Sequence, residues 1–108
     1  MKKALMLTAC ALMFVAGANA SVERGQKLYL KNCRSCHGNG TKGAVLATQA
    51  GWDKWFANGG KTLIAKHNSP KAAASSAYFN GAFKNQVKDL HDFLREYGSD
   101  SGNVPACS

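Results

Sequence analysis

The chain has 108 residues, 45% of them hydrophobic, and a formal net charge of +8 at pH 7. This length allows one small domain and excludes a multidomain enzyme. A basic chain suits an acidic protein surface, an anionic membrane face or nucleic acid, but its lysines are scattered along the sequence and form no single run.

Residues 1–20 are predicted to be a secretory signal peptide. Two lysines precede an apolar run, and Ala18-Asn19-Ala20 forms an A-x-A cleavage site. The run is too short for a membrane span, and export argues against a nucleic-acid partner. Cleavage after Ala20 leaves twelve basic and six acidic side chains, a net charge of +6. The alternative, a lipoprotein box ending at Cys10, fits less well because the apolar run continues beyond it.

The mature part of the chain shows helical patterns at its two ends. The segment from Val22 to Asn32 predicts a helix on which Gly25 and Tyr29, four residues apart, share one face. Residues 84–97 carry the strongest helical spacing of apolar side chains, and a glycine follows as a stop signal.

Between these helices, Trp52 to His67 predicts a helix that is interrupted at Gly59-Gly60. Ser69-Pro70 is a typical N-cap and first-turn pair, which indicates a further short helix ending near Phe79. Residues 38–51 hold four glycines and little periodicity, and are predicted to be a loop.

The fold class is therefore predicted as all-α, without a confident strand and without an internal repeat. The expected organisation is a signal peptide over residues 1–20, one domain over residues 21–97 and a mobile C-terminal tail over residues 98–108. A domain this small, with only 20 large apolar residues after cleavage, often needs a cross-link or a prosthetic group to stabilise its core.

The segment Cys33-Arg34-Ser35-Cys36-His37 is a C-x-x-C-H sequence, the attachment pattern of c-type haem. Two thiols at i and i+3 on a helical turn can each bond one vinyl group of a porphyrin. His37 then follows where an axial imidazole ligand of the iron is needed. The sequence predicts one covalent haem c, with Cys33 and Cys36 as thioethers and His37 as the proximal iron ligand.

Three other chemistries use the same residue types. A thioredoxin-like redox pair needs a βαβ context, which the flanking sequence lacks. A structural zinc site needs four ligands, which His67, His91 or Cys107 would have to complete. A plain disulfide between Cys33 and Cys36 leaves the adjacent histidine without a role.

Three short sequences follow one another along the chain: Gly25-x-x-Leu28-Tyr29, then C-x-x-C-H with Gly38, then Leu90-x-x-Phe93-Leu94. This order resembles the class I c-type cytochromes, in particular the small bacterial monohaem cytochromes c, over residues 22–97. The resemblance implies a cytochrome c-like fold of about four short helices around one covalently bound haem. It also implies that the first and last helices cross at Gly25, Tyr29, Leu90 and Phe93.

The chain departs from this family at the sixth iron ligand, which is usually a methionine. All three methionines lie in residues 1–20 and are lost on cleavage. His67, at the end of the middle helix, is the candidate distal ligand. His91, Cys107 and an open iron site remain as alternatives.

The resemblance and the export signal favour an electron carrier over an enzyme. The expected function is that of a periplasmic monohaem c-type cytochrome of a Gram-negative bacterium, carrying single electrons between redox proteins whose acidic surfaces dock against its lysines. The alternatives are a ligand-binding haem protein with an open distal iron and a haem subunit of a larger oxidoreductase. Cys107 is expected either as a free thiol or as the link of a disulfide dimer.

Overall fold

The computed structural model describes residues 20–106, and these residues contain helices and connecting turns without a β-strand. The all-α prediction is confirmed. In chain order the elements are α2 (Ala20–Asn32), α3 (Arg34–His37), α4 (Gly40–Ala44), α5 (Gln49–His67), the 3-10 helix η1 (Pro70–Ser75), α6 (Ser76–Phe79), the 3-10 helix η2 (Ala82–Asn85) and α7 (Val87–Glu96).

Some of the sequence predictions lie outside the described residues. These are the signal peptide up to residue 19, the lipoprotein alternative at Cys10 and every role considered for Cys107. Within the described range, none of the helices combines the length and the apolar character that crossing a membrane requires.

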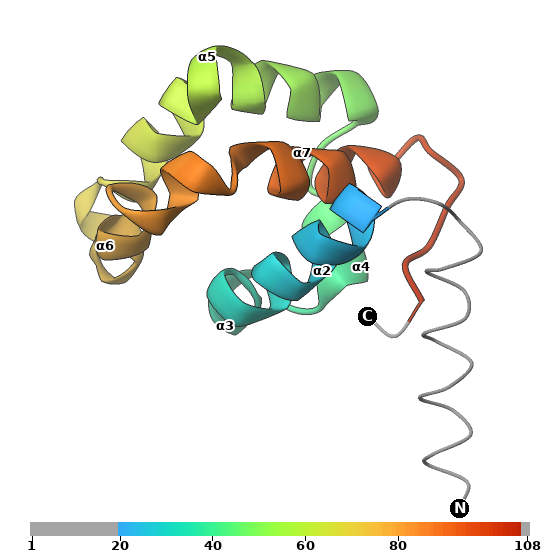
Figure 1. The fold of residues 1–108 in the computed structure, drawn as a ribbon, viewed down its shortest axis with the longest axis horizontal. Coiled ribbons are helices and arrows are strands. Elements are labelled where there is room, and N and C mark those ends of the chain that lie inside the picture. The colour runs from blue at the N-terminus through green and yellow to red at the C-terminus, as the bar shows by residue number, and fades with distance from the viewer. Residues whose placement is uncertain (1–19, 107–108) are drawn as a thin grey trace, which may run out of the picture.

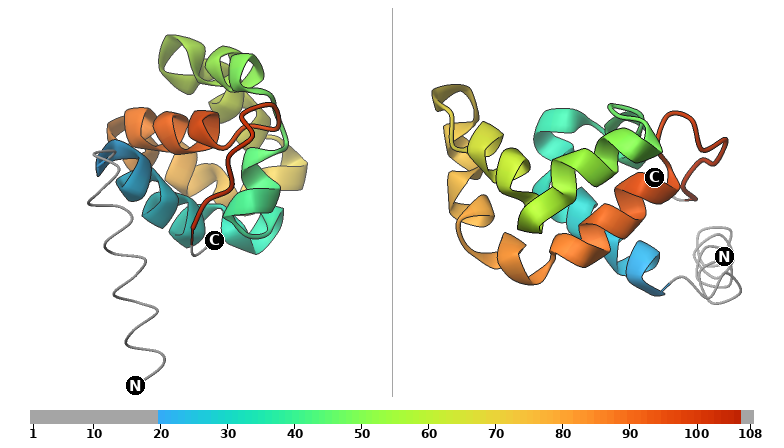
Figure 2. Two further views of the ribbon diagram at one scale, coloured as in Figure 1. Left: turned by 90° about the vertical axis from the view of Figure 1, so that its right-hand side faces the viewer. Right: turned by 90° about the horizontal axis from the view of Figure 1, so that it is seen from above.

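The helix α7 organises the fold because it lies between α2 and α5 (Figures 1 and 2). A Cβ built at Gly25 of α2 would overlap the backbone oxygen of Asp89 on α7 and lie 2.7 Å from the Cβ of Phe93. Glycine therefore lets the two backbones touch. Tyr29 packs against Phe93 with ring centroids 5.7 Å apart, and Leu90 is buried beside them. The predicted helix crossing is confirmed.

The prediction of a loop over residues 38–51 is wrong for two parts of that segment. Helix α4 begins after Asn39, whose side chain accepts a hydrogen bond from the Lys42 amide at 3.0 Å. Helix α5 already begins at Gln49, because the Thr48 hydroxyl caps the Gly51 amide at 2.9 Å. Both residues are of the types that commonly cap helix N-termini, so they indicated these two helix starts in the sequence. The glycines of the segment favoured the loop prediction instead.

The predicted break in the middle helix is confirmed and is longer than expected. Ala57 leaves the helical region, and Asn58, Gly59 and Gly60 have φ values of 55°, 70° and 80°. A Cβ at Gly60 would lie 2.8 Å from the ring of Phe83. Helix α5 is thus two helical halves joined by a left-handed turn.

The segment after α5 differs in detail from the single short helix predicted there. It consists of the 3-10 helix η1, within which Ala72 departs from helical geometry, and the short helix α6 that follows it. Ser69 stands at the N-cap position, but its hydroxyl donates back to the Lys66 carbonyl at 2.9 Å. At the C-terminal side, η2 precedes α7, so the last helix starts at Val87.

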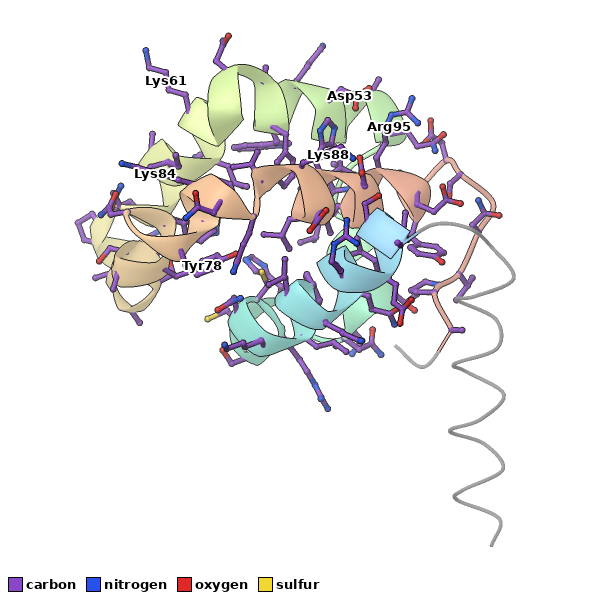
Figure 3. All side chains as sticks on the ribbon, viewed as in Figure 1. Asp53, Lys61, Tyr78, Lys84, Lys88 and Arg95 are labelled. Carbon is purple, nitrogen blue, oxygen red and sulfur yellow. The ribbon has the colours of Figure 1, made fainter. Side chains whose placement is uncertain are left out.

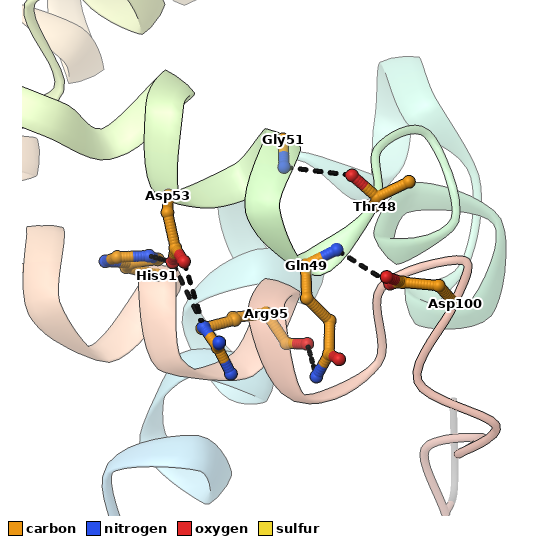
Figure 4. A network of polar contacts seen from close by, with 7 residues as sticks. All are labelled: Thr48, Gln49, Gly51, Asp53, His91, Arg95 and Asp100. Carbon is orange, nitrogen blue, oxygen red and sulfur yellow. Dashed lines mark hydrogen bonds and ion pairs between the residues drawn. The ribbon is translucent and has the colours of Figure 1, made fainter.

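The described part of the predicted mobile tail is held against the helices. The Ser99 amide donates to the Ala47 carbonyl at 3.0 Å, and Asp100 accepts from the Gln49 amide at 2.8 Å (Figure 4). The buried side chain of Gln26 donates to the Ala106 carbonyl at 2.7 Å. Residues 99, 100 and 106 are therefore hydrogen-bonded to the rest of the domain, and the mobility of the tail stays a prediction.

Candidate functional site

A cavity of about 320 Å³ opens between the N-terminal helices and the segment around the end of α5. Its volume is in the range of small-molecule and cofactor sites. Most of its lining is apolar, with aromatic rings from α2, α5, α6 and η2. The lining rings are Tyr29, Trp52, Trp55, Phe56, Phe79 and Phe83, and the polar groups among the lining are Cys33, His37, Lys66 and His67.

The C-x-x-C-H sequence folds into a tight helical turn at one wall of this cavity. The His37 amide donates to the Cys33 carbonyl at 3.0 Å, and the Gly38 amide donates to the Arg34 carbonyl at 2.9 Å. Cys33 is half-buried and lines the cavity, whereas Cys36 is exposed and does not line it. Only one of the two predicted attachment thiols thus faces the cavity in this structure.

The thiol chemistry disfavours two of the alternative interpretations. Burial, with a smaller contribution from Cys36, raises the pKa of the Cys33 thiol to about 12. A redox-active pair needs a lowered thiol pKa instead, and residues 20–106 supply no strand for a βαβ unit. Cys33 and Cys36 are free thiols, so the plain disulfide does not form here either.

Tyr29 holds the end of the C-x-x-C-H turn, a role that sequence reasoning missed. Its hydroxyl donates to the Gly38 carbonyl at 2.7 Å, and its ring lies so close to Gly43 that a Cβ there would overlap it. Burial raises the pKa of Tyr29 to about 12. The phenol is therefore a neutral donor at any physiological pH, and it ties α2 to the turn that carries His37.

His37 and His67 line the cavity together. Their ring centroids are 6.0 Å apart, with an angle of 68° between the planes. Burial lowers the pKa of His37, and the proximity of His67 lowers it further. A neutral imidazole is the form of histidine that binds a metal ion.

The His67 ring is held in one tautomer and against one neighbour. Its Nδ1 lies 2.7 Å from the Leu63 carbonyl, and because a carbonyl can only accept, Nδ1 must carry the proton. In the neutral imidazole, Nε2 then carries the lone pair that a metal ligand requires. The ring also stacks on Phe79, with centroids 4.0 Å apart and planes at 20°.

The alternative distal ligand His91 does not line the cavity. Its Nε2 lies 2.7 Å from a carboxylate oxygen of Asp53 on α5, beside Arg95 (Figure 4), and its ring stacks on Phe56 with centroids 4.9 Å apart. Within residues 20–106, no three His, Cys, Asp or Glu side chains gather as a metal-binding group. The considered zinc site is therefore not assembled there.

Charge is distributed unevenly over the molecule. Residues 54–88 contain six lysines and no acidic residue. Lys61 and Lys84 extend from the end of the molecule that lies away from Asp53 and Arg95 (Figure 3). The basic segment includes the part of α5 that lines the cavity with Lys66 and His67, so part of the cavity wall carries a lysine.

The cavity fits a haem group by the chemistry of its walls. His37 and His67 present two imidazole rings to the same cavity, with centroids 6.0 Å apart, and these rings would hold the iron if a haem were bound. Around them, aromatic and aliphatic side chains supply the apolar surface that a porphyrin needs.

Comparison with known families gives one match over most of this domain. A family model described as cytochrome C oxidase, cbb3-type, subunit III matches residues 20–96. The matched range includes the C-x-x-C-H turn, the helix crossing and the cavity. No curated protein and no solved structure matches the chain.

Proposed function

The chain belongs to the family of c-type cytochrome domains described as cytochrome C oxidase, cbb3-type, subunit III, and from this premise we propose that it is a periplasmic monohaem electron carrier with two histidine ligands. Family membership implies covalently bound haem c with iron, electron transfer and redox partner proteins. The single C-x-x-C-H sequence supports one haem per chain. The export signal over residues 1–20 supports the periplasm as its location.

The distance between the two cavity histidines is the observation that carries this proposal. In it, Cys33 and Cys36 form the thioether links, His37 is the proximal ligand and His67 is the distal ligand. The ring separation of 6.0 Å and the free lone pair on Nε2 of His67 support this pairing. A bound haem supplies a one-electron centre that alternates between Fe(II) and Fe(III).

The remaining side chains tune and protect that centre. Aromatic and aliphatic residues exclude water from the cavity, which lowers the local dielectric constant. An imidazole in place of the usual methionine lowers the reduction potential. We therefore propose a low-potential carrier of the class I type.

The lysines of residues 54–88 support a docking role toward acidic partners. The segment itself contains no acidic residue. Lys88 at its end pairs with Asp92 at 2.7 Å, whereas Lys66 lies at the cavity itself. Electrostatic steering of this kind raises the association rate with an acidic partner and weakens as salt increases. The expected signature is an electron-transfer rate that falls steeply as ionic strength rises.

The decisive test is the spin state of the purified holoprotein and of two histidine variants. Mass spectrometry should show the chain from Ser21 plus one haem, and the wild-type spectrum should be low-spin. His67→Ala should become high-spin and bind carbon monoxide. His91→Ala is the matched control and should remain low-spin. A His67→Ala variant that stays low-spin would overturn the distal assignment and leave the other ligands to be tested.

A second candidate is a haem-bearing subunit of a larger oxidoreductase, and the family description favours it. The chain's residues would play the same parts, but the partner would be permanent. Purification from the native membrane fraction under mild detergent separates the two. A stable complex that retains this chain at high salt favours the subunit, whereas its recovery as a free protein favours the carrier.

A further inference from the structure

We propose that Phe79 is a positioning residue that fixes the plane of the His67 imidazole and keeps its Nε2 directed into the cavity. This inference rests on the proposed function, since it concerns His67 as the distal ligand. It adds a residue from a different element, because His67 ends α5 and Phe79 ends α6.

The contact between the two rings is close and buried. Their centroids lie 4.0 Å apart with planes at 20°, and Phe79 is only 4% exposed. Both side chains line the same cavity. Residues 61–79 contain no other buried residue, so Phe79 is the side chain that anchors this segment in the core.

The hydrogen bond to Leu63 restrains the imidazole at one edge only. It holds Nδ1 at 2.7 Å from the carbonyl, and because His67 is only half-buried at the end of α5, breaking this single bond frees the ring to turn about its Cβ–Cγ bond. A flat ring surface at van der Waals distance opposes that rotation. The Leu63 carbonyl selects the tautomer, and the Phe79 face selects the plane.

Phe79 can act in this way because it is itself held from two sides. Its ring lies 4.8 Å from that of Phe83, which is fully buried, and 5.2 Å from that of Tyr78 at 78°. The Tyr78 hydroxyl donates to the Gln86 side chain at 2.8 Å. These contacts connect Phe79 to η2 and to the start of α7, beyond the segment that carries His67.

A second attachment keeps the ends of α5 and α6 together. The side-chain amides of Asn68 and Asn80 exchange two hydrogen bonds of 3.0 and 2.8 Å. Asn68 directly follows His67, and Asn80 directly follows Phe79. The residues after both rings are therefore paired, so the two rings are stacked before any ligand binds, and His67 is pre-organised.

The test uses the holoprotein and the variants Phe79→Leu, Phe79→Tyr and Phe93→Leu. Phe79→Leu should broaden the low-spin electron paramagnetic resonance signal of the ferric protein and speed carbon monoxide binding to the ferrous protein at least tenfold. Phe79→Tyr keeps the aromatic ring and should show the wild-type signal and the wild-type rate of carbon monoxide binding. Phe93→Leu removes an equally buried ring that does not line the cavity, and should lower stability without changing either readout.

The proposal is overturned if Phe79→Leu keeps the wild-type signal and binding rate, or if Phe93→Leu changes them equally. Should Phe79→Leu fail to fold, Phe79→Ile gives the same measurement with a different aliphatic side chain. The His67→Ala variant distinguishes failure of the proposed function from failure of this inference. If His67→Ala stays low-spin, His67 is not the distal ligand. If His67→Ala becomes high-spin while Phe79→Leu behaves like wild type, only the positioning role of Phe79 is wrong.

Discussion

The two sides of the cavity are built in different ways. On one side, α2 and α7 cross in direct backbone contact at Gly25, and their facing residues are buried. On the other side, the distal arm (residues 61–79) follows a left-handed break and has one buried residue, Phe79. Close packing along two helices fixes the first side, and a few specific side-chain contacts fix the second.

Because of this difference, we expect one side of the cavity to determine the stability of the fold and the other to determine the ligation of the haem iron. His37, the proposed proximal ligand, is attached through Tyr29 and Gly38 to the most tightly packed part of the molecule. His67, the proposed distal ligand, lies in a segment with few buried residues, which is the kind of region that opens locally at low cost. Changes in the helix crossing should therefore affect global unfolding, and changes in the distal arm should affect the haem ligand first.

The largest effect is expected from Gly25→Ala, which breaks the helix crossing. The new methyl group would overlap the Asp89 carbonyl, and because both partners are backbone, a helix must move. We expect a loss of about 3 kcal/mol or more in the free energy of unfolding, measured by urea denaturation of the holoprotein. Gly51→Ala is the control, since its Cβ would meet only Thr48 and Ala47 atoms at 3.1 and 3.2 Å. A Gly25→Ala variant as stable as that control would contradict the packing described.

The next effect, about 2 kcal/mol, is expected from Gly60→Ala, which disturbs the base of the distal arm. The residue has a φ of 80°, which costs a non-glycine residue about 1–2 kcal/mol, and its Cβ would lie 2.8 Å from Phe83. Because Phe83 supports Phe79, part of the iron should also become high-spin. Gly59→Ala has a similar φ of 70° and no atom within 4 Å, so it should lose stability without changing the spectrum.

The helix crossing was predictable because it depends on spacing along single helices. Gly25 and Tyr29 share a face by their separation, and the C-x-x-C-H turn is a local sequence. The break at Gly59-Gly60 was likewise readable from two adjacent glycines.

The contacts of the distal arm could not be predicted in this way. The stacking of Phe79 on His67 joins two helices through a 3-10 segment, and no sequence period relates them. The bond from Tyr29 to Gly38 depends in the same way on how the turn after α3 folds back. The hydrogen bond from the buried amide of Gln26 to Ala106 was not predictable either, because it joins residues 80 positions apart.

A smaller effect, about 1 kcal/mol, is expected from Tyr29→Phe, which removes the hydrogen bond to Gly38 and keeps the ring. The variant should also change how the free energy of unfolding depends on pH above pH 10. Burial raises the pKa of Tyr29 to about 12, so the folded phenol stays protonated while the unfolded one ionises near pH 10. Wild-type stability should fall from pH 10 to 12. The slope should be shallower in Tyr29→Phe but not zero, because burial also raises the pKa values of Tyr78 and Tyr97.

The smallest effect is expected from Asp53→Asn, at the polar contact that joins α5 to α7 far from the distal arm. The hydrogen bond with His91, with Arg95 contributing, lowers the pKa of this carboxyl group. Its stabilisation is therefore present above the ordinary Asp pKa of about 4 and is lost as the pH falls through the lowered value.

Because the Asp53 pair is largely exposed, we expect Asp53→Asn to cost only about 0.5 kcal/mol at pH 7, and less in high salt. Urea denaturation at pH 7 and at pH 3 should show the difference from wild type shrinking in acid, with Glu96→Gln, a half-buried carboxylate at the end of the same helix as His91, as the control. The haem spectrum should not change, since neither Asp53 nor His91 lines the cavity. A spectral change would mean that the α5–α7 contact also positions the iron ligands. It would contradict the view that one part of the molecule sets global stability and another sets haem ligation.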